Sequence, residues 1–291
     1  MNDLLTIADL GREGLEAILA LSEQDDLGRP FAGKGVALVF QKPSARTRNS
    51  MEMAVVQLGG HPVYIQKEEV GLGTRETAED VARTLACYHA IIAARVMNHG
   101  DLEAMATATD TPVLNMLSDR AHPLQALADL LTVKQLAGRI EGTRIAYVGD
   151  ANNVCRSLAE ACSLLGAELS IASPDGYGLA EKFPGVRRVA DPREAVEGAR
   201  IVYTDVWVSM GQDEETEARM RAFAPYQVTA ELMASCGDAF FLHCLPARRG
   251  EEVAAGVIDG PRSAVWRQAE NRMHTARGAM AWMAGGGGTS A

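Results

Sequence analysis

Short apolar runs alternate with amphipathic segments along most of the chain. In the first half the runs cover residues 35–40, 63–65, 90–96 and 113–117. A second set begins after residue 140 and covers residues 144–148, 168–172, 199–203 and 238–242. Short runs that are apolar throughout are typical of strands buried on both faces of a parallel sheet. Each set therefore predicts one such sheet.

The segments between the runs have the spacing of helices that bury one face. Apolar residues spaced i, i+3, i+4 and i+7 form the first face, at Met51, Ala54, Val55 and Leu58. A second face is marked by Val81, Leu85 and Tyr88. Further helices are expected at residues 124–136, 153–165, 192–198, 229–236 and 268–283.

This alternation predicts an α/β protein of two domains, each a mostly parallel sheet flanked by helices, joined by long interdomain helices. We expect a first domain at 1–134 and a second at 135–267. A C-terminal helix at 268–284 is expected to return to the first domain. The glycine-rich end, 285–291, is expected to be disordered.

Composition narrows the class of protein. The 291 residues carry 28 basic and 38 acidic side chains, a net charge of −10, which argues against binding nucleic acid or an anionic membrane through bulk charge. The apolar runs all stay well short of 18 residues, and the N-terminus lacks the features of a signal peptide, so we expect a cytoplasmic protein. The five cysteines form no C-x-x-C pair. Cys155 and Cys162 are interpreted as core residues, and no metal or cofactor is expected.

Ligands of open α/β sheets bind beyond the carboxyl ends of the strands. Residues 44–48, Ser-Ala-Arg-Thr-Arg, follow the first strand and lead into a helix. Two hydroxyls and two guanidiniums at a helix N-terminus suit a phosphate group, although an N-cap with solvated arginines would look the same.

Other polar residues follow the next strands. Arg95 stands near the end of the third strand, either aimed into a cleft or exposed. His122 precedes Pro123, which places it near the cap of the next helix with Gln125 in the first turn. A lone histidine is more often structural than catalytic, and the sequence leaves both interpretations open.

The second set of strands ends on a different group of residues. Residues 149–153 lack the G-x-G-x-x-G fingerprint, which disfavours a nicotinamide dehydrogenase, and Asn152 and Asn153 there suit either a carboxylate ligand or a turn. Asp205 could hold a cationic amine, and Ser209 and Met210 follow it in a loop that ends in glycine. A thiol, Cys244, follows the last strand.

Four segments in this order resemble the aspartate/ornithine carbamoyltransferase family. They are residues 44–48, 122–125 (His-Pro-Leu-Gln), 205–211 (Asp-Val-Trp-Val-Ser-Met-Gly) and 243–246 (His-Cys-Leu-Pro). The first two resemble the carbamoyl phosphate motifs of the whole family, and the last two are similar to those of its ornithine branch. The resemblance runs from about residue 30 to residue 283.

The resemblance implies carbamoyl transfer to L-ornithine and a role for each matching residue. The phosphate of carbamoyl phosphate would be held by Ser44, the backbone of Ala45, Arg46 and Thr47, and its carbamoyl end by Arg95, His122 and Gln125. Asn153 would meet the ornithine α-carboxylate and Asp205 its α-amino group, under Ser209 and Met210. The reacting centre would be completed by Cys244, Leu245 and Arg272. Arg46, Arg48, Arg95, His122 and Arg272 are expected to converge on one cleft.

The resemblance also implies a homotrimer or a multiple of trimers, with active sites at subunit junctions. Two positions depart from the family pattern: Ala45 stands where threonine is common, and Gly71 where some relatives carry glutamine. Competing functions are transfer to another amine, such as putrescine, acetylornithine or aspartate, and a non-catalytic phosphate-binding relative.

Overall fold

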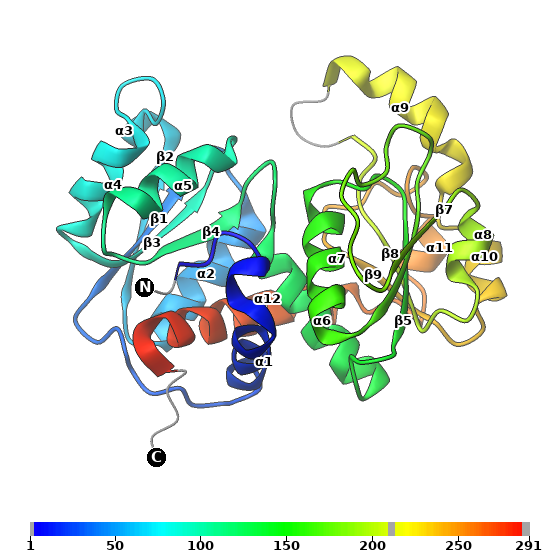
Figure 1. Cartoon of the computed structure of the whole chain (residues 1–291), viewed down its shortest axis with the longest axis horizontal. Coiled ribbons are helices and arrows are strands. Elements are labelled where there is room, and N and C mark those ends of the chain that lie inside the picture. The colour runs from blue at the N-terminus through cyan, green and yellow to red at the C-terminus, as the bar shows by residue number, and fades with distance from the viewer. Residues whose placement is uncertain (1–2, 209–212, 287–291) are drawn as a thin grey trace. The chain divides into compact units, whose positions relative to one another are not determined.

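The structure is a computed structural model that describes residues 3–208 and 213–286. The chain divides into two compact units, shown in Figure 1: unit 1 takes residues 1–128 and 271–291, and unit 2 takes residues 129–270. Both changes of unit fall inside long helices, α6 (Pro123–Ala137) and α12 (Val265–Ala281). The α/β class with one sheet in each unit is confirmed, while the domain limits at 134 and 267 stay predictions.

Unit 1 is built on a four-stranded parallel sheet in the order β2–β1–β3–β4. Its strands are β1 (Gly35–Phe40), β2 (His61–Gln66), β3 (His89–Arg95) and β4 (Val113–Leu117). Besides the two long helices, its helical elements are η1 (Ala8–Leu10), α1 (Gly11–Ser22), α2 (Ala45–Gln57), α3 (Lys67–Val70), α4 (Ala78–Ala86), α5 (His99–Ala108) and η4 (Trp282–Gly286).

The predicted apolar faces account for most of the packing in unit 1. All four residues of the first face are fully buried on or just after α2. On the second face Val81 is buried among residues of α4, α5 and the sheet, but Tyr88 is exposed. The prediction for Tyr88 is wrong because α4 ends at Ala86, so the helical spacing does not reach residue 88.

Unit 2 is built on a five-stranded parallel sheet in the order β7–β6–β5–β8–β9. Its strands are β5 (Arg144–Val148), β6 (Glu168–Ala172), β7 (Val186–Val189), β8 (Ile201–Thr204) and β9 (Phe240–His243). Its further helical elements are α7 (Asn153–Leu165), α8 (Pro192–Val196), η2 (Asp213–Glu215), α9 (Thr216–Phe223), η3 (Ala224–Tyr226), α10 (Ala230–Ser235) and α11 (Ala255–Ile258). Cys155 and Cys162 are buried on α7, as predicted.

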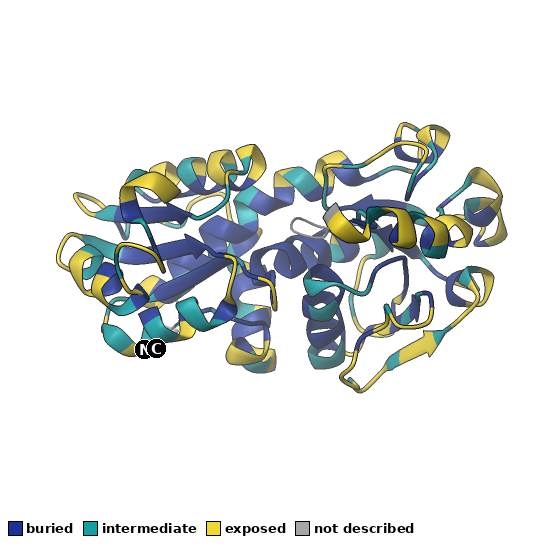
Figure 2. Ribbon diagram, turned by 90° about the horizontal axis from the view of Figure 1, so that it is seen from above, coloured by how far each residue is buried: buried dark blue, intermediate teal, exposed yellow. Residues whose placement is uncertain are grey.

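Figure 2 shows that the buried residues concentrate on the strands and on the helix faces next to them. The edge strand β7 is the exception: Arg187 and Arg188 in its middle are exposed. It therefore lacks an apolar run and was not predicted. The segment η4 includes residues 285 and 286, which the prediction assigned to the disordered end; residues 287–291 lie outside the described part of the chain. Among the described helices, none combines the length and the apolar character that a membrane span requires.

A close helix–helix approach in unit 1 depends on Gly278. A Cβ atom at this position of α12 would lie 2.9 Å from the Ile18 carbonyl oxygen of α1, and closer still to the Ser22 hydroxyl. We expect Gly278→Ala to lower the free energy of unfolding by ~1–3 kcal/mol through overpacking. Gly256→Ala on α11 is the matched control, because a Cβ there meets no atom within 4 Å. Urea unfolding of both variants checks this, and equal stability of the two would contradict it.

Candidate active site

The N-terminus of α2 forms the first part of the candidate site, in unit 1. Ser44 has an extended backbone and caps the helix, its hydroxyl accepting a hydrogen bond from the Thr47 N–H at 3.4 Å. Ala45 and Arg46 occupy the first helical turn and are exposed, whereas Thr47 is buried. Unpaired N–H groups of a first turn and an exposed guanidinium suit a phosphate ligand. The geometry thus keeps the phosphate interpretation and also confirms the N-cap.

The end of β3 reaches this same turn. Arg95 pairs in register with Phe40, the last residue of β1. The segment that follows β1 therefore starts beside Arg95. The Arg95 guanidinium is buried and lies 3.4 Å from the Thr47 hydroxyl. Of the two interpretations of Arg95, the exposed one is therefore wrong.

His122 and Gln125 open α6, as the sequence predicted. The His122 carbonyl oxygen accepts hydrogen bonds from the N–H groups of Gln125 and Ala126, at 3.0 and 3.2 Å. Both side chains are buried. Burial, and then the positive charges of Arg272 and Arg95, hold the pKa of His122 well below its usual range. The ring is neutral at neutral pH and can donate one hydrogen bond without adding charge.

The expected convergence of cationic groups is wrong for Arg48. Its side chain forms an ion pair with Glu52 of the next helical turn at 2.8 Å. Its guanidinium also lies 3.9 Å from the centre of the Tyr64 ring on β2. Arg48 is thus held along α2, while Arg95 and Arg272 are the charges that face His122.

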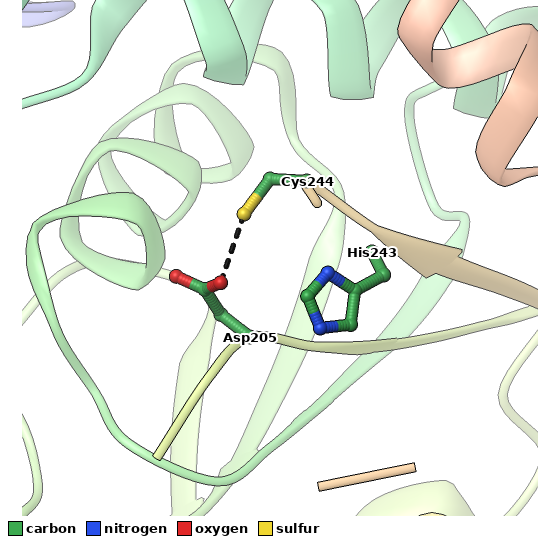
Figure 3. A group of neighbouring side chains, drawn as sticks. All are labelled: Asp205, His243 and Cys244. Atoms are coloured by element: carbon green, nitrogen blue, oxygen red, sulfur yellow. Dashed lines mark hydrogen bonds between the residues drawn. The ribbon is translucent and has the colours of Figure 1, made fainter. Parts of the chain in front are cut away.

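In unit 2 the strand register brings Asp205 next to Cys244. Thr204 of β8 pairs with His243 of β9, so the next residue of each strand lies at the same edge of the sheet. Figure 3 shows the two side chains turned toward each other, and the Cys244 thiol donates a hydrogen bond to Asp205 Oδ1 at 2.9 Å. Asp205 is buried and Cys244 half-buried.

Asn152 also contacts Asp205. Its amide nitrogen donates to Asp205 Oδ2 at 2.8 Å, and its amide oxygen caps α7 by accepting from the N–H groups of Val154 and Cys155. Sequence reasoning chose Asn153, the first residue of α7, as the ligand-binding asparagine. For Asn152 the sequence left a carboxylate contact and turn hydrogen bonds open, and the structure shows both, the carboxylate being that of Asp205.

The turn after β5 also contains one partner of an ion pair that the sequence did not predict. Asp150 and Arg219 are both buried, with Oδ2 and Nη2 2.6 Å apart. Arg219 also donates from Nε to the Trp207 carbonyl oxygen at 2.6 Å. The pair therefore connects α9 to the turn after β5 and to the chain just before residues 209–212. Ser209 and Met210 themselves lie outside the described residues.

His243 could complete a three-ligand metal group with Asp205 and Cys244, since ligand atoms of the three lie within 4.8 Å of one another. Both of its ring nitrogens already have protein partners, however. Nδ1 faces the Leu245 N–H at 2.8 Å, and Nε2 faces Glu252 at 3.0 Å. Leu245 has a φ of 61°, a left-handed conformation that costs a residue with a side chain ~1–2 kcal/mol. The contacts of His243 are those of a residue that holds this turn.

Comparison with known proteins gives the family of the chain. Residues 2–135 match the carbamoyl-P binding domain of aspartate/ornithine carbamoyltransferase, and residues 141–283 match its Asp/Orn binding domain. The chain belongs to the aspartate/ornithine carbamoyltransferase family. It is 48% identical to the ornithine carbamoyltransferase of Thermus thermophilus, with 94% of each chain covered, and 44% identical to that of Bacillus subtilis, with 94% and 90% covered.

A solved structure of the same family supports the fold. The ornithine carbamoyltransferase of Pyrococcus furiosus aligns with a TM-score of 0.93 and 42% identity, covering 98% of this chain and 97% of that one. The family's two binding domains correspond in sequence to the two sheets described above. The residues around Arg95 fall in the first match and those around Asp205 in the second.

The buried Asp150 predicts a pH-dependent stability. Burial, opposed by Arg219, raises the pKa of Asp150 to about 6. Because this lies above the ordinary aspartate pKa of 3.8, proton binding stabilises the folded state below pH 4, and this contribution is lost as the pH rises to 6. It amounts to about 3 kcal/mol, at about 1.4 kcal/mol per pH unit.

Asp150→Asn removes this titration. We expect the free energy of unfolding of the unmodified protein, measured relative to this variant, to fall as the pH rises from 4 to 7. Urea unfolding followed by tryptophan fluorescence reports it, since Trp207 contacts Arg219 in the same unit. A difference between the two proteins that stays constant over this range would contradict the prediction.

Proposed function

We propose that this chain transfers the carbamoyl group of carbamoyl phosphate to the δ-amine of L-ornithine, giving L-citrulline and phosphate. The observation that carries the proposal is the contact of Asp205 with Cys244 at the ends of β8 and β9, in a chain that matches both binding domains of the family. These residues belong to the two segments that resemble the ornithine branch. The relatives from Thermus thermophilus and Bacillus subtilis carry the same activity in their names.

Carbamoyl phosphate binds first, at the N-terminus of α2. The phosphate takes hydrogen bonds from the hydroxyls of Ser44 and Thr47, from the backbone N–H of Ala45 and from the Arg46 guanidinium. Ala45 is the first helical residue, so it offers an N–H even without the hydroxyl of threonine. This explains how the departure from the family pattern is tolerated.

The carbamoyl group lies toward the buried side of the turn. Its oxygen takes hydrogen bonds from Thr47, Arg95 and neutral His122, and its amino group is held by Gln125. Negative charge develops on this oxygen when the amine attacks, and one donor aimed at such a charge is typically worth ~3 kcal/mol. Arg272, whose charge acts on His122, adds to the positive potential of this part of unit 1.

L-Ornithine follows and binds at the ends of the unit 2 strands. Asn153 meets its α-carboxylate and Asp205 its α-amino group, with Ser209 and Met210 closing over it. The δ-amine resembles that of lysine, with a pKa of ~10.4, so it must lose a proton before it attacks. Cys244 and Leu245 position this amine, and Cys244 with Asp205 helps to accept the proton.

The reaction forms one bond and breaks one. The amine nitrogen attacks the carbamoyl carbon, the C–N bond forms, and the bond from carbon to the phosphate oxygen breaks. Phosphate leaves with the electron pair, stabilised by Arg46 and the α2 N-terminus. Loss of a proton from this nitrogen then gives the neutral ureido group of citrulline.

The oligomeric state, the location and the metabolic role of the enzyme are also inferred. We infer a homotrimer or a multiple of trimers, a cytoplasmic location and a role in arginine biosynthesis. A relative from Pyrococcus furiosus, 43% identical, is named anabolic ornithine carbamoyltransferase, which supports the biosynthetic role.

A panel of amines tests the function. The purified protein is incubated with carbamoyl phosphate and L-ornithine, putrescine, acetylornithine or L-aspartate, and both phosphate and the carbamoylated product are measured. We expect phosphate release and citrulline with L-ornithine alone. Phosphate release that depends on another amine would identify that amine as the substrate in place of L-ornithine. Absence of phosphate release with every amine would indicate the non-catalytic relative.

Two arginines of one helical turn test the phosphate site. Arg46→Ala should weaken carbamoyl phosphate binding by at least about 30-fold, because a charge-assisted hydrogen bond worth ~2 kcal/mol or more is lost. Arg48→Ala is the matched control, since Arg48 is held by Glu52 and Tyr64. Isothermal titration calorimetry measures both affinities. A loss of less than twofold for Arg46→Ala, or equal losses for both variants, would rule out the assignment.

A further inference from the structure

We propose that His243 is a positioning residue for the ornithine-binding turn at Cys244 and Leu245, and that Glu252 fixes the imidazole tautomer that this role requires. The inference rests on the proposed function and adds two residues to it. Neither residue touches substrate in this proposal; both act through the turn.

The contacts of the ring define where its proton lies. The Leu245 N–H points at Nδ1, with 2.8 Å between the two nitrogens, and an N–H can only donate, so Nδ1 must be the unprotonated acceptor. The proton of the neutral ring is therefore on Nε2, which lies 3.0 Å from Glu252 Oε1. The same oxygen accepts a hydrogen bond from the backbone N–H of Arg248 at 2.6 Å, which holds the carboxylate in place. The side chains of His243 and Glu252 are both fully buried.

The turn needs such a constraint because of its backbone. Leu245 has a φ of 61°, a region that residues with a side chain rarely occupy unless neighbouring groups impose it. The hydrogen bond to Nδ1 fixes the amide at the start of this residue. Loss of the acceptor would leave a buried N–H without its partner and free Leu245 to relax to an ordinary conformation.

The main chain of His243 is anchored as firmly as its ring. Its N–H donates to Gln268 Oε1 at 2.9 Å, and Gln268 Nε2 donates to the buried Asp129 at 2.6 Å. The next residue, Cys244, contacts Asp205. Asp129, through Gln268, and Glu252 thus hold His243 in place. His243 in turn precedes Cys244, which contacts Asp205, and both of these residues are assigned to ornithine.

Two substitutions of His243 separate this role from simple stabilisation. His243→Asn places an amide oxygen near the position of Nδ1, which keeps the acceptor for Leu245 but loses the contact with Glu252. His243→Gln places an amide N–H near the position of Nε2, which keeps the contact with Glu252 but loses the acceptor. If His243 and Glu252 were only a structural buried pair, His243→Gln would be the more active variant. If His243 positions the turn, His243→Asn is the more active variant.

The readouts are kcat and KM for ornithine, the affinity for carbamoyl phosphate and the thermal midpoint. We expect His243→Asn to retain kcat/KM for ornithine within about fivefold and His243→Gln to lose at least about 50-fold. Both variants should bind carbamoyl phosphate within twofold of the unmodified protein, since that site lies in unit 1. A His243→Gln variant as active as His243→Asn, or more so, would overturn the proposal.

Changes outside the ring complete the test. Glu252→Ala keeps the imidazole but removes the group that fixes its tautomer, and should lower kcat/KM for ornithine at least tenfold; unchanged kinetics would also overturn the proposal. This variant decides the question if His243→Gln does not fold. Val253→Ala is the matched control, because Val253 is the fully buried neighbour of Glu252 and lies in the hydrophobic core of unit 2. It should lower the thermal midpoint and leave kcat/KM within twofold.

Failure of the proposed function would look different. In that case the unmodified protein would form no citrulline from carbamoyl phosphate and L-ornithine, before any variant is compared. The positioning role fails separately if the unmodified protein is active but the two His243 variants do not follow the expected order, or if Glu252→Ala leaves the ornithine kinetics unchanged.

Discussion

Parallel pairing of the strands determines where the chemistry of this protein lies. Each unit has a sheet whose described strands all run in the same direction, so their carboxyl ends share one edge. Register then selects neighbours along that edge. Phe40 beside Arg95 brings the α2 turn to the end of β3, and Thr204 beside His243 brings Asp205 to Cys244. Residues more than 35 positions apart in sequence thereby become hydrogen-bonded partners.

The burial of charged side chains is the main free-energy cost of this arrangement. In unit 2 specific hydrogen-bond and ion-pair partners offset this cost. Asp205 receives hydrogen bonds from Asn152 and Cys244, and Asp150 forms an ion pair with Arg219. An ionised carboxylate without partners would be strongly unfavourable in such surroundings. The same contacts restrict the side chains to one geometry. The groups that keep Asp205 stable are therefore also those that aim it.

Much of this could be predicted from sequence because the signals are local. Runs of apolar residues indicated eight of the nine strands in the described part of the chain, and proline after His122 indicated the start of α6. Edge strand β7 was missed because its exposed arginines interrupt the apolar pattern. The partners Arg219 and Glu252 lie 69 and 9 positions from Asp150 and His243, and their contacts follow from tertiary packing. Neither hydrophobic periodicity nor a local motif predicts such a contact.

The acidic surplus of the chain does not oppose the binding of an anion, because the potential at the site is set locally. Arg95 and Arg272 act on His122, and both lower its pKa. A bound phosphate dianion would cancel part of their effect and favour protonation of the ring. Burial is nevertheless the largest cause of the lowered pKa, and a bound ligand increases burial. On the proposed function, His122 would therefore act as a neutral hydrogen-bond donor to the bound ligand, because its burial favours the uncharged ring.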